Sequence, residues 1–199
     1  MLVSIPIWSC RLSTILRPKF RFSPTSLLRL KKPRPKRPEQ LADTPLEHEQ
    51  RVQDALERAF RFIAKRERTV SQVSARLERD GIESAVIAEA VGQMVTDGYI
   101  SDTRFAALYA EDRRAIDGWG NERIVTNLRE AGVSTEIIEA IVGSRGHDDQ
   151  VGDAIRVLDQ RVGTKPSDAR ERERALGILA RRGYSLEIAY DAVRAYERS

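Results

Sequence analysis

Three stretches of the chain decide its fold: LERDGIESAVIAEAV at residues 77–91, LREAGVSTEIIEAIV at residues 128–142 and LARRGYSLEIAYDAV at residues 179–193. Each stretch begins 51 residues after the one before it. In all three, a leucine is followed four positions later by glycine and then by an apolar residue, and a valine ends the stretch. Self-similarity at a fixed offset is the signature of a tandem array of similar structural units.

Each repeated stretch is expected to form two helices separated by its glycine. Glycine adopts the left-handed conformation that closes a helix without steric cost. The three glycines are Gly81, Gly132 and Gly183. We expect Ser84, Ser134 and Ser185 to cap the helices that follow, because a serine hydroxyl satisfies a free backbone amide at a helix start. Glu136 and Glu187 then fall in the first turn, where the helix dipole favours negative charge.

A further amphipathic helix precedes each pair. Apolar residues recur at helical spacing over residues 52–63 and 151–162, and over residues 105–116, where Asp112 interrupts the stripe. No run alternates between apolar and polar residues as a strand would. The sequence therefore predicts an all-α fold of three tandem three-helix repeats, about nine helices, stacked in an elongated curved array because a helical hairpin cannot bury its own apolar face.

The pattern also predicts where the units begin and end. The three repeats are assigned to residues 48–100, 101–147 and 148–199. Residues 1–47 form a separate region, which includes the proline-rich basic run KKPRPKRP at residues 31–38. Proline removes backbone donors and like charges repel, so this run is expected to be an extended linker.

Charge is distributed unevenly along the chain. Residues 1–38 carry ten basic residues and no acidic one, whereas the remainder holds 24 basic and 30 acidic residues. The isoelectric point of about 9.4 therefore reflects the N-terminal region. We interpret residues 1–47 as a disordered extension or as a start assigned too far upstream. The alternative is an organelle transit peptide, whose composition is also rich in arginine and serine and poor in acids.

The composition favours a cytoplasmic protein that does not enter a membrane. No stretch approaches the roughly 18 consecutive apolar residues of a membrane helix. The first ten residues lack the positive charge that opens a secretory signal peptide. Cys10 is the single cysteine, so no disulfide framework exists and a reducing compartment fits best.

The inventory of catalytic residues predicts no enzyme, no cofactor and no metal. His48 and His147 are the only histidines and lie far apart, and no cysteine pair is present. His147, with Asp148 and Asp149, is interpreted as part of a solvated loop over residues 144–149. Residues 118–120 (GWG) are too short for a phosphate-binding loop, and we interpret them as a tight turn whose indole packs on the core.

Arginines remain as the candidate binding residues. An arginine guanidinium forms paired hydrogen bonds with carboxylates and with phosphates, so the partner is an acidic protein patch or DNA. Most arginines have acidic neighbours at helical spacing, which is also typical of a solvated helix face. The residues assigned to partner binding are Arg66, Arg68, Arg104, Arg113, Arg114, Arg123, Arg181 and Arg182.

Residues 97–133 resemble the core of the RecX family. The motifs that carry the resemblance are GYISD at 98–102, RFA at 104–106, GWG at 118–120, and Ile124, Leu128, Gly132 and Val133. With the threefold repeat, the resemblance extends over about residues 50–199. One departure is Asp117, where relatives often place a basic residue before the glycine.

The resemblance implies a regulator of the RecA recombinase. Such proteins lie along the groove of the RecA filament on single-stranded DNA, where they limit ATP hydrolysis, strand exchange and filament growth. We therefore expect a monomer that binds the RecA filament, with single- or double-stranded DNA as a secondary contact. Two alternatives remain: a helix–turn–helix DNA-binding module that acts independently of RecA, and a scaffold that binds another protein.

Overall fold

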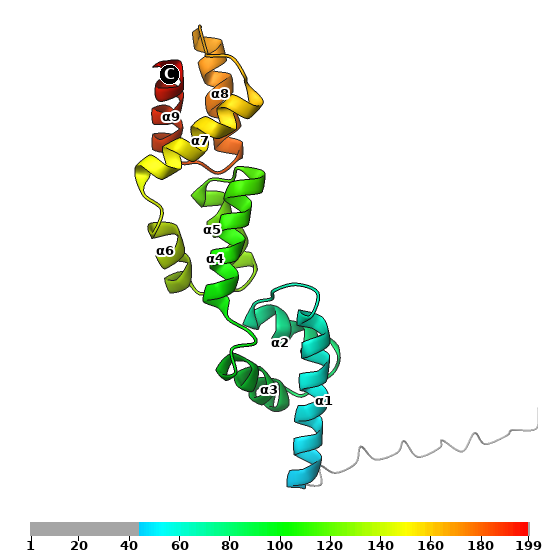
Figure 1. Ribbon diagram of the computed structural model, residues 1–199. Helices are drawn as coiled ribbons and strands as arrows, with labels where there is room; N and C mark the ends of the chain where they lie inside the picture. The colour runs from blue at the N-terminus through cyan, green and yellow to red at the C-terminus, as the bar shows by residue number, and fades with distance from the viewer. Residues whose placement is uncertain (1–43, 199) are drawn as a thin grey trace, which may run out of the picture. The chain divides into compact units, whose positions relative to one another are not determined.

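The computed structural model describes residues 44–198, which contain nine α-helices, one π-helical turn and no strand (Figure 1). The elements are α1 (Pro45–Ile63), α2 (Val70–Arg79), α3 (Ser84–Thr96), α4 (Asp102–Asp112), η1 (Arg113–Asp117), α5 (Asn121–Glu130), α6 (Thr135–Gly143), α7 (His147–Arg161), α8 (Ala169–Arg181) and α9 (Leu186–Arg198). The prediction of an all-α fold is confirmed for this part of the chain. The region at residues 1–43 lies outside the described residues.

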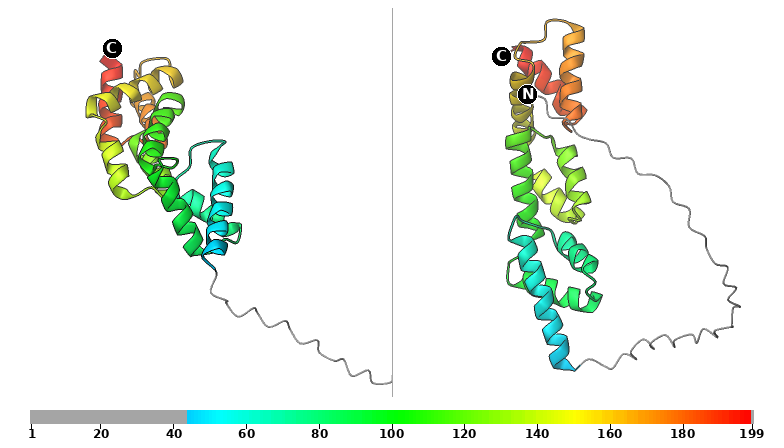
Figure 2. Two further views of the ribbon diagram at one scale, coloured as in Figure 1. Left: turned by 60° about the horizontal axis from the view of Figure 1, so that its bottom comes forward. Right: turned by 90° about the vertical axis from the view of Figure 1, so that its right-hand side faces the viewer.

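The helices pack in three consecutive groups, α1–α3, α4–α6 and α7–α9, which we call the first, second and third triplet (Figures 1 and 2). Each triplet has its own core. Leu77 and Met94 are fully buried in the first, Ile124 and Leu128 in the second, and Leu158 in the third. Three short amphipathic helices thus bury a common apolar surface that no two of them could close.

The repeated glycines close the second helix of every triplet in the same way. Gly81, Gly132 and Gly183 have φ values of +81°, +80° and +84°, in the left-handed region predicted for them. In each case the residue after the glycine donates its amide to the carbonyl of the leucine four positions before the glycine, at N–O distances of 3.2, 3.1 and 3.2 Å. These bonds satisfy carbonyls that a helix end leaves free.

The start of the third helix in a triplet is set by its distance from the glycine rather than by the position of the serine. Ser134 and Ser185 accept backbone amides as predicted. The prediction for Ser84 is wrong, because the N-cap of α3 is Glu83 and Ser84 is the first residue of the helix. The third helix is capped two residues after the glycine in the first and second triplets. The first triplet has one extra residue between glycine and serine, which carries Ser84 into the helix.

Two helices begin earlier than the sequence pattern indicated. Thr44 and Glu47 form a reciprocal capping box, so α1 begins at Pro45, three residues inside the predicted extension. Helix α7 begins at His147 after the N-cap Gly146, so the predicted loop at residues 144–149 is shorter than expected. Element η1 continues α4 at the point where Asp112 interrupts the apolar stripe.

The middle helices of neighbouring triplets meet end to end. Gly120 and Glu122, at the start of α5, donate their amides to the carbonyls of Arg182 and Gly183, at the end of α8, over 2.9 and 3.0 Å. At the start of α2, the Thr69 hydroxyl donates to the Ala131 carbonyl, at the end of α5, over 2.6 Å. The helix ends therefore fix how each triplet joins the next.

Candidate partner-binding surfaces

A basic cleft lies between α1 and α2, and we call it the Phe62 cleft. It has a volume of about 630 Å³. Its lining residues are Arg58, Arg61, Phe62, Lys65, Arg68, Arg76 and Asp80. Five of these seven residues are cations and one is an acid. On α1, residues 61 and 62 follow residue 58 by three and four positions and so lie on the same helix face, and Lys65 lies just beyond the end of this helix.

The aromatic ring organises the cations of the Phe62 cleft. The guanidinium carbon of Arg68 lies 4.3 Å from the centre of the Phe62 ring, and that of Arg76 lies 5.6 Å from it. Both distances are within the range of cation–π attraction. Burial, together with the neighbouring charge of Arg66, lowers the pKa of the Arg68 guanidinium. Arg68 is thus held in a place where its own charge is disfavoured.

A second cleft lies between η1, α5 and α8, and we call it the Trp119 cleft. Its volume is about 590 Å³. Its lining residues are Ile116, Asp117, Trp119, Arg123, Arg161, Ile178, Arg181 and Arg182. The Arg123 guanidinium lies 4.1 Å from the Trp119 ring centre and also donates to the Arg181 carbonyl. Trp119 packs against the core of the second triplet, as predicted for the GWG turn.

Arg113 also contacts Trp119, together with the neighbouring Tyr109. Its guanidinium lies 5.3 Å from the Trp119 ring and 5.1 Å from the Tyr109 ring. Its Nη1 atom donates to Asp117 over 2.5 Å, and this bond raises the pKa of the guanidinium. Asp117, the departure from the RecX pattern, therefore neutralises one of the two arginines that contact Trp119.

An arginine–aromatic pair recurs at equivalent positions of the repeat around Phe62 and Trp119. Phe62 and Arg113 occupy positions 51 residues apart, and so do Arg68 and Trp119. In the first triplet the aromatic residue comes first and the arginine second, whereas in the second triplet the order is reversed. The pair is thus kept at equivalent positions of the repeat although both residue identities have changed.

A third cleft, of about 540 Å³, lies between α2, α4 and α5. Its apolar lining residues include Phe105, Leu108 and Tyr109, and the rings of Phe105 and Tyr109 stack at 5.8 Å. Arg66 and Arg113 stand at its edge with acidic residues beside them. Its charge is mixed, unlike that of the two clefts above.

Besides Arg113 and Arg123, two more of the eight predicted arginines bind other residues of the chain. Arg104 pairs with Glu67 at 3.0 Å and donates to the carbonyls of Gly98 and Tyr99. Arg114 is half-buried and donates to the Asn121 side chain, and burial together with the charge of Arg145 lowers its pKa. These contacts tie α4 to the first triplet and η1 to α5. Partner binding by either residue stays a prediction.

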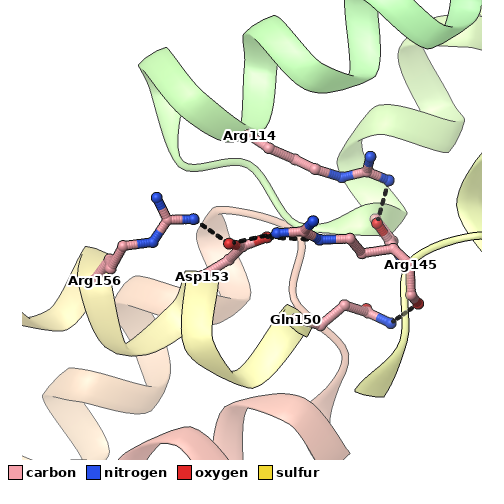
Figure 3. Close-up of polar contacts among 6 residues, drawn as sticks. Arg114, Arg145, Gln150, Asp153 and Arg156 are labelled. Atoms are coloured by element: carbon pink, nitrogen blue, oxygen red, sulfur yellow. Dashed lines mark hydrogen bonds and ion pairs between the residues drawn. The ribbon is translucent and has the colours of Figure 1, made fainter. Parts of the chain in front are cut away.

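Arg114 belongs to a polar cluster around Asp153, which is 6 % exposed (Figure 3). Arg145 and Arg156 direct their guanidinium groups at the Asp153 carboxylate, and the Arg145 pair is bidentate, with a closest approach of 2.8 Å. These hydrogen bonds raise the pKa of Arg145. A buried carboxylate so closely paired holds the connection from α6 to α7 in place.

The structure brings some of the predicted residues together and separates others. Arg123, Arg181 and Arg182 meet in the Trp119 cleft, Arg68 lies in the Phe62 cleft, and Arg66 lies at the edge of the third cleft. Arg76 and Arg161 line the Phe62 and Trp119 clefts, respectively, but were not predicted from the sequence as binding residues. Arg58, Arg61 and Lys65 were also left out of the assigned binding residues, although three cations within four positions of Phe62 were a signal that could have found them.

Nothing in the described residues suggests a metal centre or a membrane span. Across residues 44–198, no group of three or more histidine, cysteine or carboxylate side chains is placed to hold a metal ion. None of the helices in that range is long and apolar enough to cross a membrane. His147 pairs with Asp191 at 3.1 Å, and His48 pairs with Glu89 at 2.8 Å.

Comparison with known proteins points to one family. The model of the first three-helix domain of RecX matches residues 55–94, and that of the second matches residues 101–141. The regulatory protein RecX of Thermobifida fusca (strain YX) is 30 % identical over 138 residues, which cover 68 % of this chain and 74 % of the relative. That of Mycobacterium sp. (strain JLS) is 29 % identical over 140 residues, 67 % of this chain and 76 % of the relative.

Solved structures show the same fold. The crystal structure of RecX from Lactobacillus salivarius has a TM-score of 0.68 at 17 % identity and covers 76 % of this chain and 99 % of its own. A second crystal structure of regulatory protein RecX has a TM-score of 0.63 at 18 % identity, with 74 % and 73 % covered.

The fold and the clefts define a tandem three-helix repeat protein that presents arginine-rich clefts and, in its described residues, no metal centre. Taken with these matches, the chain belongs to the RecX family, and it is a non-enzymatic regulatory protein. The resemblance expected from the sequence is confirmed.

Proposed function

We propose that this chain binds the RecA filament on single-stranded DNA and modulates it in the cytoplasm. The main effect is inhibition of ATP hydrolysis, strand exchange and filament extension during recombination and DNA repair. The observation that carries the proposal is membership in the family of regulatory proteins RecX. The RecA partner itself rests on what that family is known to do.

The repeated arginine–aromatic clefts support a partner that is itself repetitive. Successive protomers of a filament present the same surface at regular intervals. The Phe62 cleft lies in the first triplet and the Trp119 cleft lies between the second and third, and both combine arginines with an aromatic ring. Linked contacts gain from effective concentration, so each cleft needs to bind only modestly.

The charge of the third helix in each triplet favours binding to the RecA filament over an independent helix–turn–helix DNA-binding module. In such a module the second helix of the motif enters the major groove and its residues approach phosphates. That helix corresponds to α3, α6 or α9 here. Helices α3 and α6 contain no lysine or arginine, whereas they carry Glu89, Glu136 and Glu139. Two of the three helices therefore lack the charge that duplex binding needs.

The test is a titration of the full chain into the DNA-dependent ATPase of RecA. We expect the double variant Arg161→Gln/Arg181→Gln, in the Trp119 cleft, to require about tenfold more protein for half inhibition, since the loss of two interface arginines costs about 1.4 kcal/mol or more. Both side chains are exposed, so the fold is kept. The matched control Arg129→Gln/Arg198→Gln removes two exposed charges outside the clefts and should inhibit as the wild type does.

An unchanged ATPase at stoichiometric wild-type protein would reject the proposal. Steeply salt-dependent binding to duplex DNA, unaffected by RecA, would favour the DNA-binding module instead. A second series lacks residues 1–43 but keeps Thr44, because Thr44 caps α1. Equal inhibition by this series would show that the basic N-terminal region is dispensable, whereas lost inhibition would assign it part of the contact.

A further inference from the structure

The cations of the Phe62 cleft are not balanced by acids. Asp80, the single acid in its lining, is engaged by Arg76 at 3.2 Å. Arg61 pairs with Glu57 on the outer surface of α1, at 3.8 Å. Within the described part of the chain, Arg58, Lys65 and Arg68 have no ion-pair partner. Three positive charges therefore converge on one cleft without compensation.

Arg68 gives the strongest indication that this cleft binds an anion. Its Nε atom is buried and receives no hydrogen-bond acceptor from residues 44–198. A buried donor without a partner costs free energy, and a buried charge without one costs more. Stacking on Phe62 holds the guanidinium in position, so little side-chain entropy is lost when a ligand binds. The cleft keeps a destabilising arrangement that an anionic ligand would relieve.

From this geometry we propose that the Phe62 cleft is a phosphate-binding site, with Arg58, Lys65 and Arg68 as its ligands. A chain of phosphates offers several charges and many acceptor oxygens within a few ångströms, which matches three converging cations. A carboxylate offers a single charge, so an acidic peptide would need several side chains to converge at once. The volume of about 630 Å³ falls within the range of small-molecule sites and admits a triphosphate or a short segment of nucleic-acid backbone.

Two sources of phosphate share this chemistry, namely a free polyphosphate such as a nucleoside triphosphate and the backbone of single-stranded nucleic acid. The site does not depend on the proposed action on RecA, since it is defined by residues of the first triplet alone. Binding is therefore measured without RecA, and failure of one proposal leaves the other to be judged by its own experiment.

The experiment is calorimetric titration of the full-length chain at physiological salt, with inorganic tripolyphosphate in one series and a short oligothymidylate in the other. Arg58→Gln and Lys65→Gln remove exposed charges whose loss does not disturb packing. The double variant Arg58→Gln/Lys65→Gln should bind at least one of the two ligands about tenfold more weakly, a loss of about 1.4 kcal/mol. If oligothymidylate binding is weakened, it should also depend less on salt. The slope of log K against log salt should become shallower by the amount that corresponds to about one or two phosphate contacts.

The controls separate this cleft from the basic N-terminal region, which is present in every variant. Arg79→Gln removes one exposed charge from α2 outside the cleft and should leave both affinities unchanged. Weakening of tripolyphosphate binding identifies free polyphosphate as a ligand, and weakening of oligothymidylate binding alone identifies the backbone. Affinities for both ligands equal to those of the wild type would overturn the proposal. The proposal would also be overturned if oligoglutamate bound more tightly than tripolyphosphate and oligothymidylate and if the double variant lost this binding.

Discussion

The junction between the first and second triplets and the junction between the second and third bring the same two helix ends together, but different chemical groups hold them. At the second junction, backbone amides at the start of α5 donate directly to backbone carbonyls at the end of α8. At the first, the Thr69 hydroxyl reaches the end of α5 and the Asp102 carboxylate accepts the Val70 amide. Backbone-to-backbone bonds join the helix ends at the second junction, with Arg123 adding a side-chain bond to the Arg181 carbonyl, whereas side chains supply the bonds at the first.

The difference traces to one position of the repeat. Thr69 and Gly120 lie 51 residues apart, and each is the N-cap of the middle helix in its triplet. Where the cap is glycine, the two backbones approach until amides and carbonyls pair, and a side chain at Gly120 would collide with the backbone of Gly183 and Tyr184. Where the cap is threonine, its hydroxyl supplies the bond instead.

Both junctions solve the same problem of unpaired groups at helix ends. The first amides and last carbonyls of a helix have no partner within it, and opposite ends of two helix dipoles attract. In the third triplet the N-cap is Asp168, whose carboxylate accepts the Glu171 amide at 2.7 Å. A carboxylate cannot donate to a carbonyl, so this end of α8 is closed by its own side chains.

The largest loss of stability is expected from Gly120→Ala at the second junction. The added methyl group has no space against the backbone of Gly183, so the two amide–carbonyl bonds must lengthen or break. We expect a loss of about 3 kcal/mol, from overpacking and from weakened hydrogen bonds. The measurement is urea denaturation, with hydrogen exchange of the Gly120 and Glu122 amides as the local readout.

Gly92→Ala is the matched control for Gly120→Ala. Gly92 lies inside α3 with open space where a methyl group would stand, so alanine should stabilise the chain by about 0.5–1 kcal/mol. If Gly120→Ala did not lower stability and left exchange of the Gly120 and Glu122 amides unchanged, the backbone junction would not constrain the third triplet.

Gly120 and Gly183 also show which parts of the fold could be predicted from the sequence. The 51-residue offset and the helix-closing role of Gly183 follow from local rules, because the left-handed conformation is a property of one residue and its neighbours. The close approach of Gly120 to Gly183 does not follow, since it joins two positions that are 63 residues apart. Residues 118–120 were therefore interpreted as a turn alone.

The type of side chain in the candidate site could be predicted from the sequence, but the positions of those side chains in space could be predicted only in part. Counting arginines identified Arg123 and Arg181, but no local rule shows that one donates to the carbonyl of the other. The same count could not separate Arg114, which is half-buried beside Asn121, from arginines that face solvent. Burial depends on which triplet packs against η1, and that is a property of the assembled fold.

A smaller effect is expected at the first junction from Thr69→Val, which keeps the shape of the side chain and removes its hydroxyl. Thr69 is fully buried, donates to the Ala131 carbonyl and accepts the Gln72 amide at 3.1 Å. Loss of both bonds should cost about 2 kcal/mol in urea denaturation. Thr69→Ser keeps the hydroxyl and should cost about 1 kcal/mol or less, so equal losses in the two variants would refute a junction held by side-chain hydrogen bonds.

The smallest effect is expected from Tyr184→Phe at the second junction. Tyr184 follows the glycine that closes α8, at the position where the first two triplets have Ile82 and Val133, which carry no hydroxyl. Its Oη atom is buried and has no hydrogen-bond partner among residues 44–198. Removing an unsatisfied polar atom should leave stability at neutral pH unchanged or raise it by up to about 1 kcal/mol.

The same substitution should be more visible in alkali. Burial, and then the charge of Asp153, raises the pKa of Tyr184 from 10.0 to about 12. The folded chain therefore keeps this phenolic proton over a pH range in which the unfolded chain loses it, so the stability due to Tyr184 is complete below pH 10 and declines as the pH rises toward 12. Tyr184→Phe should remove this part of the decline in denaturation curves recorded from pH 9 to 12, and a decline as steep as that of the wild type would place the alkali-sensitive group elsewhere.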